Sequence, residues 1–134
     1  MILVDTNVLV DVASGDPKWK EWSIDAMTKA MRERGPLVIN AIICAEFSLG
    51  FATSAACDAE IERFGTVFMD LPRLAAFRAG VAFREYRQRG GARTNPLPDF
   101  FIGAHASALG IPILTRDVVR YRTYFPEIQV VGPT

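Results

Sequence analysis

Cysteine and histidine are scarce in this chain, and their scarcity excludes several kinds of site. Among 134 residues there are two cysteines, Cys44 and Cys57, and one histidine, His105. Two thiols are too few for a disulfide framework or a cysteine-based zinc site. We expect both thiols to be buried and reduced, as in a protein of the cytoplasm.

Long apolar runs are also lacking. No run approaches the ~20 residues needed to span a bilayer. The first run is interrupted by Asp5 and has no basic segment before it, unlike a signal peptide. The sequence therefore predicts a soluble protein with no membrane partner.

Lysine is rare and confined to one segment, at Lys18, Lys20 and Lys29. A receiver domain requires a lysine after its last strand, and a P-loop requires one within a glycine-rich segment that is also missing. Phosphotransfer of the haloacid-dehalogenase type needs a second aspartate two residues after the first, where this chain has Asn7. A Ser-His-Asp hydrolase would have to use His105, and there is no Gly-x-Ser-x-Gly turn. These four classes of α/β protein are excluded.

The overall composition is that of one globular domain. Half of the residues are hydrophobic and 22% are charged, so we expect a single domain over residues 1–134. Residues 1–70 hold six Lys/Arg and eleven Asp/Glu, whereas residues 71–134 hold nine Arg and four Asp/Glu. A basic half made only of arginine suits a nucleic-acid partner, although a solvated surface produces the same bias.

Short apolar runs alternate with helical segments along the chain. Strands are expected at about 2–5, 37–39, 66–69, 111–115 and 128–131. Helices are expected at about 17–34, 41–52, 57–64, 71–89 and 98–109. Gly35-Pro36 should end the first helix and Asn40 should cap the second. Strands joined by helical crossovers predict an α/β fold, a three-layer α/β/α sandwich around a central parallel sheet.

Four acidic residues are placed where this fold would gather them. Ligands of such sheets bind outside the carboxyl ends of the strands. Asp5 ends the first predicted strand and Asp117 follows another by two residues, so both leave the sheet at that edge. Asp99 lies in the first turn of a helix that crosses back to the sheet, and Glu46 lies about one and a half turns into another. All four carboxylates can meet at one edge.

A cluster of four carboxylates needs a cation. Like charges ~4 Å apart repel by roughly 1 kcal/mol in bulk water and by more in a partly dry cleft. Because the ligands are all oxygen, with no His or Cys pair, the expected ion is Mg²⁺ or Mn²⁺. Such an ion keeps waters, one of which could attack a phosphodiester.

Each acid taken singly also has a structural explanation. Asp5 could begin a helix by accepting from free backbone N–H groups, and Asp117 could cap a short C-terminal helix. Asp99 sits where a helix dipole favours an anion. Their joint placement is what favours a site.

Four stretches together resemble the PIN-domain ribonucleases, especially the VapC-type toxins of bacterial toxin–antitoxin pairs. They are "VDTNVLVD", "AEFSLGF", "LPDFFIGAHASALGIPILTRD" and "YRTYFPEIQVV", and they span nearly the whole chain. The resemblance implies a metal-dependent endoribonuclease that cuts single-stranded or looped RNA with a metal-activated water and leaves a phosphate on the 5′ side of the break. It also implies a cognate antitoxin and a homodimer.

The resemblance carries over to individual residues. Asp5, Glu46, Asp99 and Asp117 would be catalytic, Asp5 and Asp99 would bind one or two Mg²⁺ or Mn²⁺ ions, Thr6, Asn7 and Thr115 would be polar support, and Arg93, within the loop Arg93-Thr94-Asn95, and Arg116 would contact substrate. The assignment of Glu46 rests on its spacing to Leu49-Gly50. His105 lies six positions after Asp99, about 240° around the helix, so we expect a packing or surface role for it.

Aromatic pairs suggest where an antitoxin would bind. Trp19 and Trp22 lie three apart on one predicted helix, and Phe47 and Phe51 lie four apart on another. They could form an apolar groove for a partner segment, although aromatics at helical spacing also serve as core.

Two other functions remain open from the sequence. One is a catalytically silent PIN-like module that binds RNA or protein, which the presence of all four acids argues against. The other is a housekeeping RNA-processing nuclease without an antitoxin, which the small single-domain size argues against. No motif identifies the RNA that is cleaved, because looped RNA is recognised by shape and few contacts.

Overall fold

A computed structural model describes residues 1–91 and 97–134 of the chain. Its centre is a sheet of five parallel strands in the order β3-β2-β1-β4-β5. The strands are β1 (Ile2–Val4), β2 (Leu37–Ile39), β3 (Val67–Phe68), β4 (Ile113–Leu114) and β5 (Val130–Val131). Each lies inside a range predicted from the sequence.

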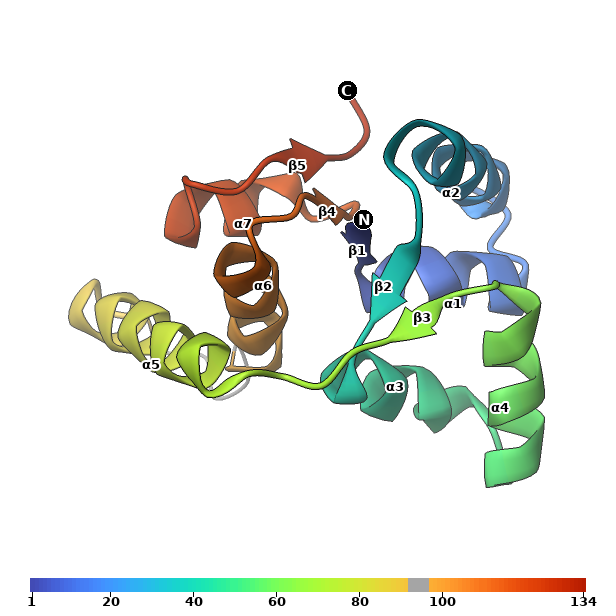
Figure 1. Ribbon diagram of the computed structural model, residues 1–134, viewed down its shortest axis with the longest axis horizontal. Coiled ribbons are helices and arrows are strands. Elements are labelled where there is room, and N and C mark those ends of the chain that lie inside the picture. The colour runs from blue at the N-terminus through green and yellow to red at the C-terminus, as the bar shows by residue number, and fades with distance from the viewer. Residues whose placement is uncertain (92–96) are drawn as a thin grey trace.

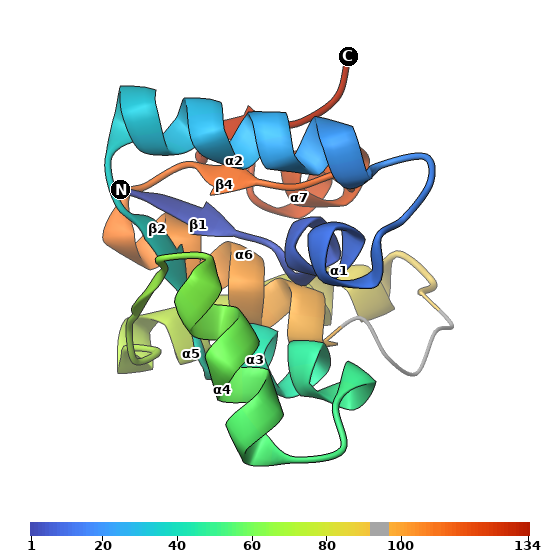
Figure 2. The ribbon, with the colours of Figure 1, turned by 90° about the vertical axis from the view of Figure 1, so that its right-hand side faces the viewer.

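The strands are continuous apolar runs because helices cover both faces of the sheet. Every residue of β1, β2 and β4 is buried, whereas both residues of the edge strand β3 are exposed. Figures 1 and 2 show α1, α2 and α4 on one side of the sheet and α5, α6 and α7 on the other. The predicted α/β/α sandwich is confirmed.

The helices follow the predicted order with several shifted ends. They are α1 (Thr6–Ser14), α2 (Lys20–Arg34), α3 (Ala41–Phe47), the 3₁₀ helix η1 (Ser48–Gly50), α4 (Ser54–Arg63), α5 (Arg73–Gln88), α6 (Leu97–Leu109) and α7 (Val118–Tyr124). The expected helix over 41–52 ends at Phe47 and continues as η1. The apolar run after Asp5 forms the separate helix α1, for which the sequence predicted a turn or helix start.

Two local signals act as predicted. The Asn40 side chain accepts a hydrogen bond from the Ile43 backbone N–H at 3.0 Å and so caps α3. Gly35 ends α2 with a φ of 91°, a conformation that favours glycine, and the chain turns directly into β2.

A close approach between α6 and α7 depends on Gly103. A Cβ built there would lie 2.5 Å from the Phe125 ring and 3.1 Å from the Tyr121 ring. Glycine therefore lets Tyr121 reach the end of β1, where its hydroxyl contacts Asp5.

The sheet has one point where the crossovers change sides. From β1 the chain runs through α1 and α2 to β2, and it returns to β4 through α5 and α6 on the opposite face. The carboxyl ends of β1 and β4 flank this point, which is the usual ligand position in open α/β sheets. Asp5 follows β1 and Thr115-Arg116-Asp117 follows β4 at that place.

Within the described ranges, no single helix has the length and hydropathy to cross a membrane. The segments Ala41–Gly50 and Ser54–Arg63, bent by 114°, pass that test only as a pair and only by length and composition.

Candidate active site

Asp5 is held rigidly at the end of β1. Its carboxylate accepts hydrogen bonds from the Thr6 backbone N–H at 2.7 Å, the Thr115 hydroxyl at 2.7 Å and the Tyr121 hydroxyl at 3.1 Å. The Asn7 amide donates a longer bond of 3.4 Å. With only 4% of its surface exposed, Asp5 is a nearly buried carboxylate whose position is fixed by three different elements.

Glu46 is tied to the residue after Asp5. The Thr6 hydroxyl donates to the Glu46 carboxylate at 2.8 Å, which joins α3 to the start of α1. Glu46 therefore lies over the same edge of the sheet, as its position in the predicted helix required.

Asp99 of α6 and Asp117, at the start of α7, both contact Arg120. The Arg120 guanidinium forms an ion pair with Asp99, and its Nε lies 3.7 Å from an Asp117 carboxylate oxygen. Asp117 occupies the N-cap position of α7. Within the residues the structure describes, however, its side chain makes no capping hydrogen bond. Its carboxylate thus faces Arg120.

The four acids form one electrostatic cluster with Asp99 at its centre. Burial raises the pKa of Asp5 to about 6, against hydrogen bonds that favour the ionised form, and the charge of Asp99 adds to the increase. Burial likewise raises the pKa of Glu46; the hydrogen bond from Thr6 lowers this pKa, and the charge of Asp99 raises it further. Burial also raises the pKa of Asp99; the charge and hydrogen bond of Arg120 lower this pKa, and the charge of Asp117 raises it further. The charge of Asp99 thus acts on Asp5 and Glu46, and the charge of Asp117 acts on Asp99.

The raised pKa of Asp5 predicts a pH-dependent stability in metal-free solution. An acid whose pKa is 3.8 when unfolded and about 6 when folded binds more protons in the folded state between these values. Stability should therefore fall as pH rises from about 4 to about 6, by about 3 kcal/mol from this residue alone at ~1.4 kcal/mol per pKa unit.

The measurement is thermal unfolding in a chelator across that pH range. Asp5→Asn should flatten the decline, because the amide cannot ionise. Equal slopes in the two proteins would contradict the assignment.

The donor chemistry of the cluster fits a divalent cation. Carboxylate oxygens are the ligands that Mg²⁺ and Mn²⁺ prefer, and raised pKa values are what a group of acids shows without its counter-ion. Across residues 1–91 and 97–134, no three Asp, Glu, His or Cys side chains already stand at metal-binding geometry. The guanidinium of Arg120 instead contacts Asp99 and Asp117. The residues fit the ion by type.

The three predicted supporting residues contact the acids. Thr115 donates to Asp5 and accepts from the Asp117 backbone N–H at 2.9 Å, so one hydroxyl orders both residues. Thr6 donates to Glu46, and the amide oxygen of Asn7 accepts from the Arg116 backbone N–H at 3.3 Å.

Arg116 is engaged elsewhere than in the acidic cluster. Its guanidinium bonds both carboxylate oxygens of Asp11, at 2.7 and 2.9 Å, and lies 4.9 Å from the Trp19 ring centroid. Asp11 is 2% exposed and also accepts from the Ser23 hydroxyl at 2.8 Å. This geometry favours a structural role for Arg116 over the predicted substrate contact. The other predicted contact, Arg93, lies outside the described residues.

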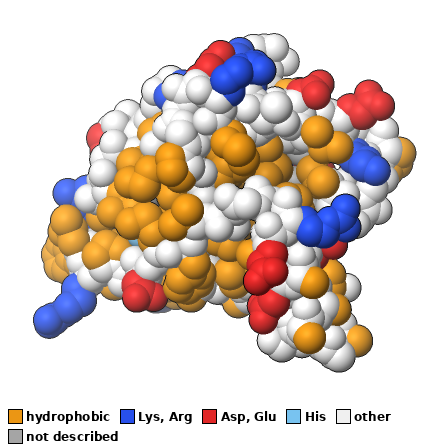
Figure 3. All heavy atoms as spheres, turned by 45° about the vertical axis from the view of Figure 1, so that its right-hand side comes forward, with side chains coloured by type: hydrophobic (Ala, Val, Ile, Leu, Met, Phe, Trp, Pro, Cys, Tyr) orange, Lys and Arg blue, Asp and Glu red, His pale blue; other side chains and the backbone are white. Residues whose placement is uncertain are grey.

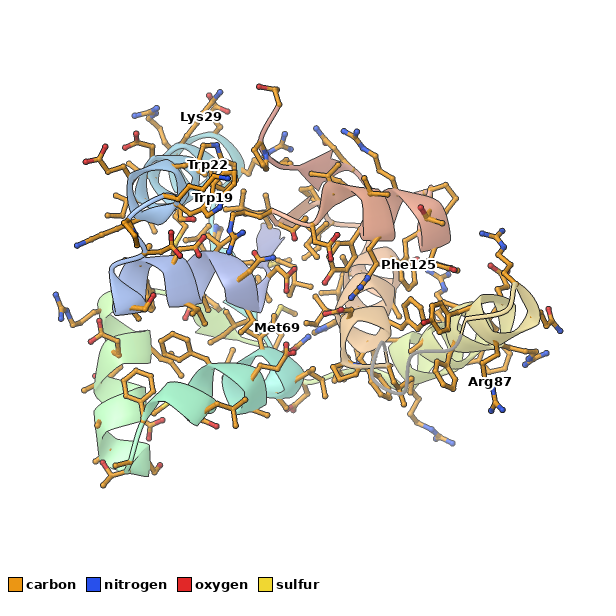
Figure 4. All side chains as sticks on the ribbon, turned by 180° about the vertical axis from the view of Figure 1, so that it is seen from behind. Trp19, Trp22, Lys29, Met69, Arg87 and Phe125 are labelled. Carbon is orange, nitrogen blue, oxygen red and sulfur yellow. The ribbon has the colours of Figure 1, made fainter. Side chains whose placement is uncertain are left out.

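The predicted four-aromatic groove is wrong in its composition. Trp19 and Trp22 lie side by side at the start of α2 (Figure 4), with ring centroids 5.8 Å apart. Phe47 and Phe51 are 5.1 Å apart and line a hollow with Val10 of α1 instead. The pairs separate because Arg116 stacks on Trp19 and Phe47 is buried in the core.

His105 has the packing role expected for it. It is fully buried, and its Nδ1 lies 3.0 Å from the Asn40 amide nitrogen. Because an amide nitrogen can only donate, the His105 Nδ1 accepts this hydrogen bond. Burial lowers its pKa, which keeps the ring neutral. Among the described residues, its Nε2 has no hydrogen-bond partner. Nothing connects it to the acidic cluster.

Two residues of the cluster were missed from the sequence, Arg120 and Tyr121. A signal for Arg120 existed, since it follows Asp117 by three positions, a spacing that places side chains on one helix face. The contact of Tyr121 with Asp5 spans 116 positions and depends on how α7 packs, so no local pattern predicts it.

The fold is shared with solved bacterial proteins of low sequence identity. VapBC2 from Rickettsia felis, bound to a DNA fragment from its promoter, matches at a TM-score of 0.73 and 19% identity over 100% of both chains. VapBC-1 from nontypeable Haemophilus influenzae matches at a TM-score of 0.74 and 18% sequence identity over 98% of both chains. A toxin–antitoxin complex from Klebsiella pneumoniae matches at a TM-score of 0.69 and 22% sequence identity, over 100% of this chain and 98% of the matched chain.

Comparison at the level of sequence families reaches further than pairwise identity. No curated protein is a significant sequence match to this chain. The family model described as PIN domain matches residues 2–126, which is most of the chain and includes all four clustered acids. The chain therefore belongs to the PIN domain family.

Proposed function

We propose that this protein is a metal-dependent endoribonuclease that acts as the toxin of a toxin–antitoxin pair. The observation that carries the proposal is the gathering of Asp5, Glu46, Asp99 and Asp117 beyond β1 and β4, where Thr6, Thr115 and Arg120 link them through hydrogen bonds and ion pairs. Membership of the PIN domain family and structural likeness to VapBC complexes support the same reading.

Asp5 and Asp99 would hold Mg²⁺ or Mn²⁺. When bound, the ion supplies activation of water for phosphodiester hydrolysis and neutralises charge on the phosphate. The chain's own part is positioning: Thr115 and Tyr121 fix the Asp5 carboxylate, and Thr6 fixes that of Glu46. Asp117, ordered through its backbone by Thr115, completes the cluster.

The basic surface beside the site supports an RNA substrate. Arg84, Arg87 and Arg89 lie exposed near the end of α5, and Figure 4 shows Arg87 pointing outward. Arginine binds phosphate oxygens in bidentate fashion and stacks on bases. Arg93 follows this segment and remains a proposed substrate contact.

An antitoxin would cover apolar surface that the fold leaves open. Figure 3 shows apolar side chains gathered in patches between scattered charged groups. A groove of about 490 Å³ is lined by Ile24, Met27 and Met31 of α2 together with Phe64. The structural neighbours include toxin–antitoxin complexes, which favours an antitoxin segment as the occupant.

The proposed homodimer has a candidate surface on α5. Leu74 and Phe77 are 49% and 68% exposed there, unusually open for large apolar side chains. A second copy would shield them.

Expression of the protein alone, followed by an RNA cleavage assay, tests the function. We expect growth arrest that is relieved by co-expression of the small protein encoded beside it. The purified protein should cleave RNA in Mg²⁺ or Mn²⁺ and stop when a chelator is added, because the acids alone cannot activate water.

Other outcomes would identify the alternatives. RNA binding without cleavage in either metal would point to the catalytically silent module. Cleavage without growth arrest or a co-purifying partner would point to a housekeeping nuclease. Cleavage that persists in the chelator would overturn the metal mechanism.

A further inference from the structure

Arg120 brings a positive charge into the acidic cluster from within the chain. It is carried by α7, three residues after Asp117, and its guanidinium contacts Asp117 and Asp99 from two different elements. The pair Asp99–Arg120 spans 21 positions, so it joins α6 to α7.

The position of Arg120 matters because these carboxylates attract any cation. Asp99 and Asp117 both contact the Arg120 guanidinium, and the charge of Asp117 acts on Asp99. A unit positive charge beside two carboxylates is attracted to both of them, and the attraction is stronger at a partly buried site than in bulk water. The guanidinium thus neutralises part of the negative charge of Asp99 and Asp117 that a divalent ion would otherwise neutralise.

The same arginine is free enough to leave. Its side chain is 28% exposed, and those of Asp99 and Asp117 are 25% and 45% exposed. The Arg116–Asp11 pair differs, because Asp11 is only 3% exposed and also bonds Ser23. Arg116 thus pairs with a buried carboxylate, whereas both carboxylates that Arg120 contacts are partly exposed.

We propose that Arg120 is an internal counter-cation that occupies the cation position of the cluster in the metal-free protein and competes with the divalent ion for Asp99 and Asp117. This inference rests on the proposed metal-dependent function. Arg120 is a positioning residue: it keeps the two carboxylates together in the absence of metal and withdraws when the ion binds.

Competition of this kind has a defined thermodynamic signature. The apparent metal affinity is lower than the intrinsic affinity of the carboxylates, by the fraction of molecules in which Arg120 has withdrawn. The metal-free protein is in return more stable than it would be without the arginine, since Asp99 and Asp117 do not face each other unpaired.

The test is Mn²⁺ binding by isothermal titration calorimetry on three full-length, metal-free proteins: wild type, Arg120→Gln and Arg122→Gln. Arg122 is exposed and lies on the same helix, so its substitution removes an equal charge outside the cluster. We expect Arg120→Gln to bind Mn²⁺ at least about tenfold more tightly than wild type, while Arg122→Gln stays within about threefold.

Thermal unfolding supplies a second readout. In a chelator, Arg120→Gln should melt below wild type, and saturating Mn²⁺ should raise its melting temperature more than that of wild type. Should Arg120→Gln fail to fold, Arg120→Lys keeps the charge without the planar fork and should bind Mn²⁺ between the wild-type and tenfold-tighter values.

The outcomes separate this inference from the proposed function. Equal or weaker Mn²⁺ binding by Arg120→Gln would overturn the competition and leave the metal site standing. No Mn²⁺ uptake by either wild type or Arg120→Gln would overturn the metal-dependent function itself. For Arg120→Lys, binding no tighter than wild type would also count against competition.

Discussion

Asp99→Asn is expected to reduce metal-dependent RNA cleavage at least ~100-fold and to abolish growth arrest, because a lost ligand removes several kcal/mol of transition-state charge stabilisation. The substitution keeps the size of the side chain and removes the charge that raises the pKa of Asp5 and of Glu46. Removing that charge should lower the pKa of Asp5, so the metal-free variant should be no less stable than wild type near neutral pH.

The measurements are initial cleavage rates in Mg²⁺ and thermal unfolding with and without the ion. Asp25→Asn is the matched control, since Asp25 is exposed on α2, outside the acidic cluster, and its substitution removes the same charge. A variant at Asp99 that cleaves RNA as fast as the Asp25 control would contradict the central role given to this residue. A variant that loses activity only because it unfolds would show up in the melting curve.

The carboxyl-edge placement of the acids follows from the sequence because topology alone determines it. Strands recognisable as short apolar runs, separated by helical segments, require a parallel sheet. Residues that directly follow strands, such as Asp5 and Asp117, then have to lie at one edge. Asn40 and Gly35-Pro36 mark helix ends by chemistry confined to a few neighbouring residues. These features are local, so a single sequence is sufficient to predict them.

The features that the sequence did not predict depend on packing between distant segments. Arg116 is adjacent to Asp117, and its closeness to the acids suggested a substrate contact. Its guanidinium turns instead to Asp11, 105 positions away, because that buried carboxylate needs a counter-ion. Tyr121 likewise reaches Asp5 only because Gly103 allows α7 to approach α6. Neither contact, Arg116 with Asp11 or Tyr121 with Asp5, can be predicted from the spacing of residues that are neighbours in the sequence.

Arg116→Ala is expected to destabilise the protein by ~3 kcal/mol, because removing one partner leaves the other as an unpaired buried charge. The Asp11 carboxylate would keep only the Ser23 hydroxyl as a side-chain partner among those described here for it. For a chain of this size the melting temperature should fall by roughly 10 °C. The stacking of the guanidinium on Trp19 adds to the loss.

A double-mutant cycle distinguishes this structural role from a substrate contact. Asp11→Asn combined with Arg116→Ala removes both charges, so the double variant should regain more than half of the lost stability. RNA cleavage below the melting temperature should recover in parallel, because the segment from β4 to Asp117 is again held without an unpaired charge. If Arg116 bound substrate, the double variant would instead keep the raised KM of the single variant while its stability recovered. A melting temperature unchanged by Arg116→Ala would show that the pair with Asp11 does not hold α1, α2 and the segment after β4 together.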